Sequence, residues 1–542
     1  MRTEFGFESR RSPVLARNGI VATSQPLAAQ VGLEILRQGG NAADAAVATA
    51  AVLNVVEPTS TGIGGDCFCL FYDAHDQQVH AVNGSGRAPA ALTIEILNAA
   101  GCDGAMPQRG PHAVTVPGTA AGWQDTVERH GRLTLATVLD PAIRLAEEGH
   151  PVAPIISQAW QRSADLLHSA SPNGAEMLID GRGPRAGELR KNPNLGKVLR
   201  AVADGGAEAF YRGWPGQALI DVLQSLGGLM TVDDLAQHCS TFEPPISTTY
   251  RDYTVYECAP NGQGLTALIA LNILEGYDLK GLDPRSSVYT HLLIEALRLA
   301  FADTRWFVAD PAQSPVPLEG LLSKDYASER RVFIDPLQAQ TDPTRGEPVN
   351  SSDTVYLSAV DGDGNACSFI NSNYQGVGTG IVPRGCGFTL QNRGAGFVLD
   401  PDHPNALAPR KHPYHTIIPA MSTHADGELH ASFGVMGGYN QPQGHVQVFA
   451  NLVDHDMDPQ LALDAPRFSI YDDPPNGGVY VEDGYPTTTM SELAALGHEV
   501  VPVSEFRRTA FLGKGQIIVR ERESGVLWGG SDPRSDGAAV GF

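Results

Sequence analysis

The sequence predicts a mixed α/β (α+β) fold in which antiparallel sheets stack against each other and helices cover their outer faces. Helix and strand patterns come in blocks and do not alternate strictly, which argues against a doubly wound parallel sheet. Pairs of short strands joined by polar turns are expected at 67–83 and 354–370, and helical patterns dominate from 133 to 305.

The first two elements are predicted to be helices. Residues 26–38 place apolar side chains at helical spacing and stop at Gly39-Gly40, a common helix end. Asn41 then stands at an N-cap position, with Asp44 three residues later as an imperfect capping box. The Ala/Val-rich run that follows to Val56 is apolar on nearly all sides, so this second helix should be buried.

A hairpin and a helical region come next. Residues 67–72 and 78–83 read as two strands joined by a short turn around His75-Asp76. After residue 133 helical patterns prevail, and the expected helices are 135–148, 216–226, 232–237 with Thr231 as N-cap, and 287–307. This part of the chain should cover a sheet.

The segment 335–353 differs from its surroundings because it is polar, rich in Pro, Gly, Gln and Thr, and without periodicity. Such a segment is typical of an exposed linker that tolerates cleavage. Directly after it, 354–360 alternates as a strand, 361–365 supplies turn residues, and 366–370 returns as a second strand. A hydroxyl residue, Thr354, therefore opens a hairpin where the linker ends.

The C-terminal part continues the mixture of strands and helices. Further strands are expected at 387–390, 431–436 and 478–481, and further helices at 457–464 and 488–496.

Charge and composition restrict the partners. With 38 Lys and Arg against 61 Asp and Glu, the formal net charge is −23, which repels nucleic acid and anionic membrane surfaces. We find no apolar run long enough for an export signal or a membrane span, so a cytoplasmic protein with a small-molecule partner is expected. The seven cysteines are scattered and without CxxC pairs, and buried reduced thiols are the preferred interpretation.

Common catalytic and cofactor signatures are weak. Gly84-Ser85-Gly86 lacks the spacing of a nucleophile elbow, and the glycines at 376, 378 and 380 do not form a nucleotide-binding motif. His412 and His415 are three residues apart, but Pro413 forbids an ordinary helix interior there, and no carboxylate motif completes a metal triad. We therefore predict neither a metal nor a cofactor.

By itself, Asp353-Thr354 is a weak signal, since any loop can end in this pair. Many further blocks, in the same order, resemble the gamma-glutamyltransferase (gamma-glutamyltranspeptidase) family of N-terminal nucleophile hydrolases. The resemblance runs from about residue 18 to the C-terminus, and its blocks are 41–47, 57–58, 62–65, 87–89, 322–326, 354–356, 363–366, 378–382, 437–438, 465–467 and 531–535. So many blocks in one order are far more specific than any single one.

The resemblance implies a four-layer αββα sandwich, one intertwined domain made of two autoprocessed chains. The precursor would cut itself between Asp353 and Thr354 into a large chain, 1–353 with its linker at about 335–353, and a small chain, 354–542. Thr354 would be the catalytic nucleophile, and its hydroxyl would react once a base takes its proton. Gly437 and Gly438 match the family's oxyanion glycines. The two chains would be partners of each other, and a dimer of such heterodimers is a further option.

Substrate-binding residues are also implied, with changes from the family pattern. His415 and Thr416 stand where the family has paired serines, and Ser372 stands where a threonine supports the terminal amine. Family members that cleave glutathione hold the glutamyl α-carboxylate with an arginine, and this position is Ser85 in the present chain. They hold the α-amine with an asparagine and an acidic residue, and these positions are Tyr374 and Gly396. Two nearby cations, Arg87 and Arg393, are candidates to receive a substrate carboxylate.

The sequence therefore predicts an autoprocessing amidohydrolase that transfers the acyl group of a small acidic amide through Thr354 to water or to an amine. An acyl group with an α-ammonium would be disfavoured, because a buried charge without a counter-charge costs several kcal/mol. Relatives that act as glutaryl-type cephalosporin acylases or oxamate amidohydrolases fit this pattern. The alternatives are an ordinary gamma-glutamyltransferase or glutathione hydrolase and, in another class, a non-catalytic binding protein on the same fold.

Overall fold

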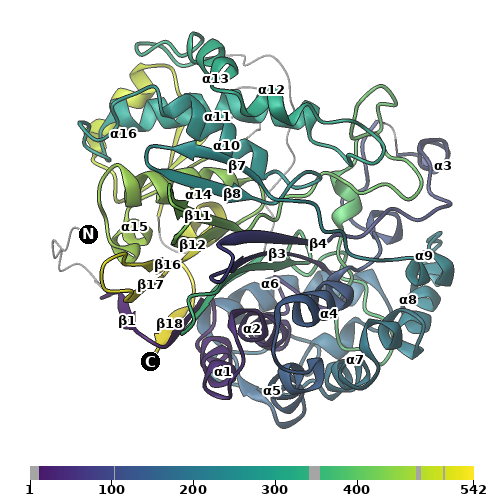
Figure 1. Ribbon diagram of the computed structural model, residues 1–542. Coiled ribbons are helices and arrows are strands. Elements are labelled where there is room, and N and C mark those ends of the chain that lie inside the picture. The colour runs from purple at the N-terminus through teal and green to yellow at the C-terminus, as the bar shows by residue number, and fades with distance from the viewer. Residues whose placement is uncertain (1–10, 103, 341–353, 472–477, 505–506) are drawn as a thin grey trace.

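Two large antiparallel sheets form the centre of the molecule in the computed structural model, which describes residues 11–102, 104–340, 354–471, 478–504 and 507–542. The six-stranded sheet has the order β18-β2-β9-β10-β3-β4 and the seven-stranded sheet the order β1-β17-β16-β12-β11-β8-β7. Side chains pack between the sheets, as where the hydroxyl of Ser358 donates to that of Ser432 over 2.6 Å. Figure 1 shows helices outside both sheets, so the predicted four-layer αββα sandwich is confirmed.

Each large sheet takes strands from both ends of the chain. The six-stranded sheet consists of β2 (Gly19–Thr23), β3 (Asp66–Asp73), β4 (Gln78–Gly84), β9 (Val355–Asp361), β10 (Ala366–Ser372) and β18 (Ala538–Gly541). The seven-stranded sheet consists of β1 (Val14–Ala16), β7 (Ile246–Tyr250), β8 (Tyr253–Glu257), β11 (Ala420–His424), β12 (Leu429–Met436), β16 (Lys514–Arg520) and β17 (Leu527–Ser531). A small sheet holds β13 (Phe468–Ile470), β14 (Val479–Glu482) and β15 (Val500–Val503), and β5 (His150–Pro151) pairs with β6 (Leu189–Arg190).

Helices cover the six-stranded sheet on its outer face, and the first large hydrophobic core lies beneath them. They are α1 (Pro26–Arg37), α2 (Ala42–Val56), α4 (Thr119–His130), α5 (Leu135–Glu148), α7 (Pro193–Tyr211) and α8 (Trp214–Ser225). Helix α2 is buried along its whole length and begins with the predicted capping box, in which Asn41 and Asp44 exchange side-chain and backbone hydrogen bonds. Its all-apolar surface is explained by this position between the sheet and the other helices.

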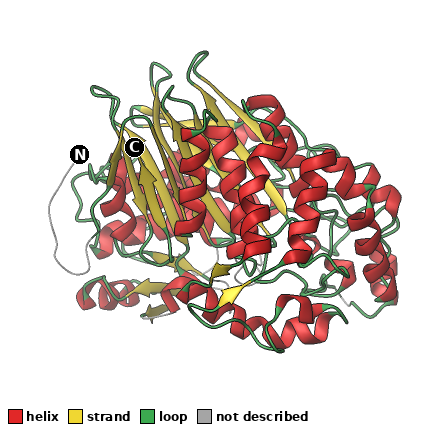
Figure 2. Ribbon diagram, turned by 90° about the horizontal axis from the view of Figure 1, so that it is seen from below, coloured by secondary structure: helices red, strands yellow, loops and turns green. Residues whose placement is uncertain are grey.

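The second core lies between the seven-stranded sheet and helices α10 (Gly264–Leu274), α11 (Ser287–Phe307) and α14 (Asn440–Val453). Figure 2 shows the helices packed around the strands in the perpendicular view. The remaining helices are α3 (Ile94–Ala99), α6 (Pro154–Ala170), α9 (Val232–Ala236), α12 (Leu318–Leu322), α13 (Lys324–Arg331), α15 (Pro459–Asp464), α16 (Thr487–Ala495) and α17 (Arg507–Phe511). No helix of the described residues is long and apolar enough to cross a membrane.

Most predicted elements are present, and two predictions need correction. The expected strand at 387–390 is a loop, because Gly387 has a φ of +65°, outside the extended region. The region 133–305 is not only helical, since it also contributes β7 and β8. Residues 246–250 alternate buried and exposed, a strand pattern that was missed within the helical surroundings. Of the predicted linker, 341–353 lies outside the described residues.

Candidate active site

Thr354 lies at the start of β9, where the structure buries it to 2% exposure. Strands β9 and β10 are antiparallel, with Val355 opposite Asn371, so the next pair outward is Thr354 and Ser372. Their hydroxyl oxygens are 3.0 Å apart, and the Ser372 hydroxyl also accepts a hydrogen bond from the backbone N–H of Tyr374 at 2.8 Å. The hairpin register alone therefore fixes a second hydroxyl beside the predicted nucleophile.

Arg393 belongs to the same cluster and comes from a short 3₁₀ turn at Arg393–Gly396. Its guanidinium donates to the hydroxyl of Thr416 at 2.7 Å and to that of Ser372 at 3.4 Å, and it lies 4.1 Å from the centre of the Tyr374 ring. Ser372 thus contacts both Thr354 and Arg393. Five residues singled out from the sequence meet at one place: Thr354, Ser372, Tyr374, Arg393 and Thr416.

The charge of Arg393 is unusual because it is fully buried without a close acidic partner. Among the described residues no carboxylate lies within 4.0 Å of it, and its Nε–H makes no hydrogen bond. Burial lowers the pKa of Arg393 to about 10, against the raising effects of Tyr374, Asp66 and Tyr439. A desolvated guanidinium with an unused N–H is well suited to receive an anion.

Tyr374 stands where the family's asparagine was expected, and it offers a phenol in place of a carboxamide. Its backbone has a φ of +79°, a conformation that non-glycine residues seldom adopt. Its ring lies against the Arg393 guanidinium, and burial raises the pKa of its phenol. Backbone conformations of this kind occur often in functional sites. Gly396, at the expected acidic position, ends the same 3₁₀ turn.

His415 points to a carboxylate that was not singled out from the sequence. Its Nε2 lies 3.0 Å from Oδ2 of Asp66, the first residue of β3, and both side chains are fully buried. Burial, Arg393 and His412 hold the pKa of His415 well below its usual range, so the imidazole is neutral. The available sequence signal was a carboxylate at the first position of a hydrophobic strand, directly after the Gly62–Gly65 tract.

Gly437 and Gly438 follow β12 and have φ angles of +141° and +60°. The side-chain amide of Gln263 donates to the carbonyl of Gly438 at 2.8 Å and to that of Thr416 at 2.7 Å. Through Thr416 and Arg393 this hydrogen-bond network connects the glycine pair with Ser372 and Thr354. Gln263, at the N-cap of α10, is a further residue that sequence reasoning missed.

Arg87, by contrast, has no contact with this cluster in the described part of the chain. It lines a separate pocket of about 250 Å³ together with Val116, Asp234, His238 and Arg410. Ser85, two residues earlier, is buried, with its hydroxyl 3.1 Å from Nδ1 of His412. Asp353 lies outside the described residues.

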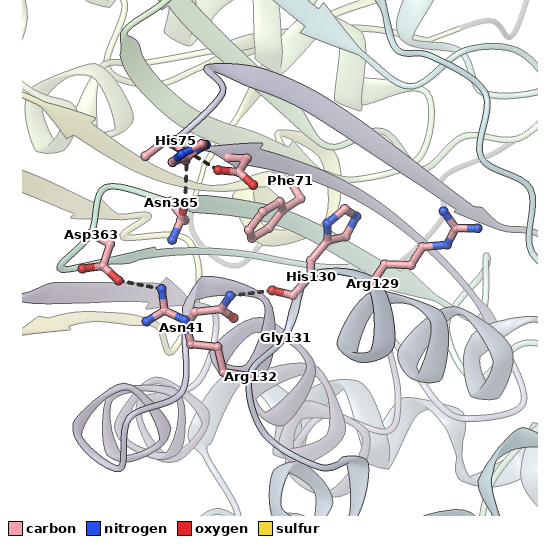
Figure 3. A pocket seen from close by; sticks show the side chains of 11 residues that line it. Asn41, Phe71, His75, Arg129, His130, Gly131, Arg132, Asp363 and Asn365 are labelled. Atoms are coloured by element: carbon pink, nitrogen blue, oxygen red, sulfur yellow. Dashed lines mark hydrogen bonds and ion pairs between the residues drawn. The ribbon is translucent and has the colours of Figure 1, made fainter.

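A larger surface pocket, of about 540 Å³, lies at the opposite end of β9 (Figure 3). It is lined by Asn41, Phe71, His130 and residues of the β9–β10 turn, including Asp363 and Asn365. Because β9 spans Val355–Asp361, this pocket is roughly 20 Å from Thr354 at a rise of about 3.4 Å per residue. It is not part of the Thr354 cluster.

One group of side chains has the composition of a metal site. His291, Glu295 and His498 are buried, with ligand atoms within 4.8 Å of one another. Most of their polar atoms already have partners, however, since the two imidazoles contact each other at 2.8 Å, His291 also contacts the carbonyl of Asp335 at 2.8 Å, and Arg298 donates to Glu295 at 3.1 Å. Arg298 already supplies the positive charge that a cation would bring.

Comparisons with known proteins agree with this fold. A family model described as Gamma-glutamyltranspeptidase matches residues 28–542. The chain is 38% identical to the glutathione hydrolase-like YwrD proenzyme of Bacillus subtilis, over 98% of this chain and 99% of that protein. It is 33% identical to the oxamate amidohydrolase proenzyme of Klebsiella pneumoniae, over 97% and 99%. The crystal structure of a cephalosporin acylase from Bacillus halodurans superposes with a TM-score of 0.91 at 43% identity, covering 100% of this chain and 99% of the other.

Proposed function

The chain belongs to the gamma-glutamyltranspeptidase family, and on that premise we propose that it is a self-cleaving amidohydrolase with Thr354 as nucleophile. Its relatives are enzymes named as proenzymes, which supports maturation by chain cleavage. We place the cut between Asp353 and Thr354, giving a large chain, 1–353, and a small chain, 354–542. The observation that carries the proposal is the buried Thr354 hydroxyl, held 3.0 Å from Ser372 in contact with a desolvated arginine.

The sheets explain how two cleaved chains would stay together. In the six-stranded sheet β9 and β10 of the small chain lie between β2 and β3 of the large chain. In the seven-stranded sheet the central strands β17, β16, β12 and β11 belong to the small chain, and β1, β8 and β7 at the two sides belong to the large chain. Neither sheet is complete without both chains, so cleavage would yield an intertwined heterodimer and not two domains.

Cleavage would also complete the catalytic machinery. A threonine hydroxyl needs a base, and a new α-amine on Thr354 has a reference pKa of about 7.7 to 8.0, suited to take its proton near neutral pH. The Thr354 oxygen then attacks the substrate carbonyl. The C–N bond of the substrate breaks, its amine leaves with the proton that the Thr354 α-amine had taken from the hydroxyl, and an ester to Thr354 remains. Water attacks this ester, releases the acid and returns the proton to the threonine oxygen. An amine in place of water would give transfer.

We assign the oxyanion site to Gly437 and Gly438, which the Gln263 amide ties to Thr416. Donors of this kind stabilise the tetrahedral intermediate, and losing one typically costs about 3 kcal/mol of transition-state stabilisation. We expect Gly438→Ala to lower kcat more than a hundredfold with little change in KM, since Gly438 has a φ of +60° that alanine adopts poorly. Unchanged kcat in a correctly cleaved variant would place the oxyanion donors elsewhere.

For the substrate, we propose an amide whose acyl group ends in a carboxylate and carries no α-ammonium. Arg393 would bind that carboxylate, while an ammonium ion in the same pocket would be repelled by the guanidinium. The names of two relatives, an oxamate amidohydrolase and a cephalosporin acylase, are compatible with small acidic acyl groups. The second candidate is ordinary glutathione hydrolysis, favoured by the names of the 38% and 30% identical relatives from Bacillus subtilis.

The nucleophile is tested by the chain pattern of purified protein. Wild type should run as two fragments on a denaturing gel, with Thr354 as a new N-terminus, and Thr354→Ala should remain one chain without amidase activity. Thr354→Ser is the matched control, because it keeps a hydroxyl and should still cleave. Cleavage of Thr354→Ala at the same bond would assign the cut to an outside protease, and an intact wild-type chain would contradict the proposal.

A further inference from the structure

Asp66 joins four segments of the candidate site. Its Oδ1 accepts hydrogen bonds from the backbone N–H of Gly86 at 3.1 Å and of Gly118 at 3.0 Å, and from the side-chain amide of Gln391 at 2.9 Å. Its Oδ2 contacts His415 at 3.0 Å. The carboxylate is fully buried, and every one of these partners comes from a different part of the chain.

These partners stand next to the residues that we place at the substrate. Gln391 precedes Arg393 by two residues, and His415 directly precedes Thr416, which accepts from Arg393 at 2.7 Å. The backbone carbonyl of Asp66 accepts from the side chain of Asn371, the neighbour of Ser372, at 2.9 Å. Asp66 therefore fixes the chain segments that carry Arg393, Thr416 and Ser372.

Asp66 also supplies the negative charge that Arg393 otherwise lacks. No carboxylate of the described residues lies within ion-pair distance of Arg393, yet Asp66 is the carboxylate whose charge acts on it, beside the phenols of Tyr374 and Tyr439. The attraction is reciprocal, since Arg393 is the strongest influence that favours the ionised form of Asp66. In an empty site the two charges balance each other through a buried, weakly screened space.

We propose that Asp66 is a proton-linked positioning residue: it is partly ionised while the site is empty, and it takes up a proton from solvent when a substrate carboxylate binds Arg393. This inference rests on the proposed recognition of an acyl carboxylate by Arg393. A bound anion neutralises the guanidinium and repels the Asp66 carboxylate, so both effects favour the protonated form. Proton uptake spares the pocket a second buried negative charge, which would otherwise weaken binding.

The surroundings of Asp66 support this assignment of the proton. Burial raises the pKa of Asp66 to about 7, so a small change in its neighbourhood changes its charge near neutral pH. The other titratable groups that act on it or on which it acts are His415, Arg393, the Cys67 thiol and the Tyr211 phenol. His415 stays neutral, and burial raises the pKa values of Cys67 and Tyr211 well above their usual range. The new Thr354 α-amine is the group that would titrate in the same interval.

Calorimetry of glutarate binding to the cleaved enzyme tests the proposal. Titrations at pH 7 in buffers of different ionisation enthalpy give the number of protons taken up, and we expect about half a proton per glutarate, since Asp66 is then half ionised. Above pH 7 the Kd of glutarate should rise by up to about tenfold per pH unit. Asp66→Asn should abolish most of the uptake and flatten this dependence. Asp361→Asn, a buried carboxyl at the far end of β9, is the matched control and should change neither.

The outcomes separate the two levels of the proposal. Equal glutarate affinity in wild type and Arg393→Gln refutes recognition by Arg393 and, with it, this inference. Dependence on Arg393 with undiminished uptake in Asp66→Asn refutes the role of Asp66 alone, and it assigns the proton to the Thr354 amine if His415→Gln also leaves the uptake undiminished. Loss of uptake in His415→Gln but not in Asp66→Asn reassigns it to His415. If Asp66→Asn does not fold, difference infrared spectra of wild type with ¹³C-labelled glutarate decide: a new protonated-carboxyl band supports the proposal, and its absence overturns it.

Discussion

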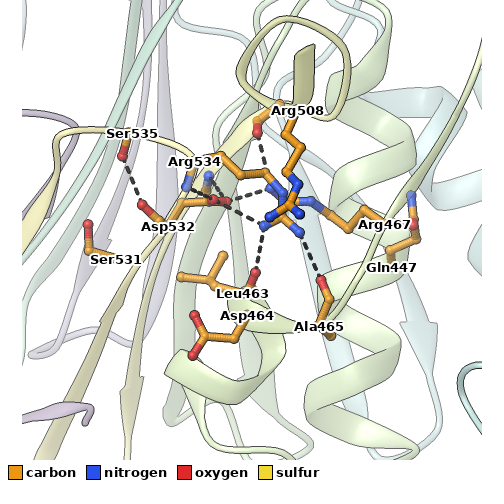
Figure 4. Close-up of polar contacts among 12 residues, drawn as sticks. Gln447, Leu463, Asp464, Ala465, Arg467, Arg508, Ser531, Asp532, Arg534 and Ser535 are labelled. Carbon is orange, nitrogen blue, oxygen red and sulfur yellow. Dashed lines mark hydrogen bonds and ion pairs between the residues drawn. The ribbon is translucent and has the colours of Figure 1, made fainter. Parts of the chain in front are cut away.

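Two buried arginines of this protein, Arg393 and Arg534, have opposite surroundings: carboxylates pair with Arg534 but not with Arg393. Arg534 binds Asp532 and Glu482 and also donates to the carbonyls of Leu463 and Ala465 (Figure 4). Its two carboxylates raise its pKa against the effect of burial, and the pKa of Asp532 is lowered by Arg467 and Arg534. Arg393 has hydroxyls and an aromatic ring in place of carboxylates, and its pKa is lowered to about 10.

This difference separates a structural ion cluster from a cation that is ready for a ligand. Removing one partner from a fully paired buried ion cluster costs free energy of folding, because the remaining charge loses its counter-charge. A buried charge that has no counter-charge already lowers the stability of the folded protein. Arg393 is such a buried charge without a close carboxylate, and it lies beside Thr354. Binding of an anion there would compensate the desolvation cost of the guanidinium. Substitutions at the two arginines should therefore have different effects.

The largest expected effect is on stability. Arg534→Met removes the guanidinium that binds the buried carboxylate of Glu482. Because this carboxylate then lacks a main counter-charge, we expect a loss of about 3 to 5 kcal/mol in the free energy of unfolding. Arg393→Met removes an incompletely paired charge from a space that an unbranched side chain fills, so its effect should be near zero or stabilising. Thermal unfolding of the two variants, with Tm followed by circular dichroism, makes the comparison. Equal losses would show that Arg393 is a structural arginine like Arg534.

A smaller effect should appear on acidification, and it concerns the histidines around the candidate site. The folded pKa values of His412, about 3, and of His415 lie below the unfolded value of about 6.5, so the stability they contribute above pH 6.5 is lost as the pH falls. Asp66 acts in the opposite direction, because its folded pKa of about 7 lies above its unfolded value, and it offsets one of the two. The two histidines together outweigh the opposite effect of Asp66, so these groups should lower the free energy of unfolding as the pH falls below about 6.5.

The Arg534 cluster should resist the same change. The pKa of Asp532 is below its ordinary value of 3.8, so its contribution is lost only at still lower pH. Hydrogen exchange at pH 7 and pH 5, corrected for intrinsic rates, compares the peptides around 411–417 and 531–535. We expect protection to decrease first around 411–417. Equal decreases, or an earlier decrease around 531–535, would contradict the assigned charge states.

Much of the fold follows from local sequence. The capping box at Asn41, the helix from Ser287 to Phe307 and the hairpin after Thr354 were all predictable, since caps, periodicity and turn residues act over a few positions. The predicted hairpin also accounts for one contact of the site, because the antiparallel register of its strands places Ser372 beside Thr354. The missed strand β7 has a clear alternation, and β8 follows it directly, but both strands stand within a helical region.

The rest of the site depends on long-range packing. Asp66 and His415 are 349 positions apart, and Gln263 reaches Gly438 across 175 positions, so no local pattern indicates these contacts. Arg87 shows the opposite case, since its proximity to Ser85 in sequence suggested a substrate contact. Its side chain lines the pocket with His238 and Arg410, apart from the Thr354 cluster, so of the two predicted carboxylate-binding arginines Arg87 is the one whose substitution should matter least. Sequence position indicates which residues are available, and the path of the chain decides which of them meet.

The role of Arg393 is tested most directly by the specificity of cleaved enzyme for glutaryl and γ-glutamyl anilides, measured as kcat/KM in wild type, Arg393→Gln and the matched control Arg87→Gln. Wild type should prefer the glutaryl compound. Arg393→Gln should lower kcat/KM for that compound by about ten- to more than a hundredfold, corresponding to about 1.5 to 3 kcal/mol for a charged hydrogen bond, while Arg87→Gln should change it little. A preference of wild type for the γ-glutamyl anilide, or an unchanged glutaryl rate in Arg393→Gln, would contradict the assignment of Arg393 as the residue that selects the acyl group.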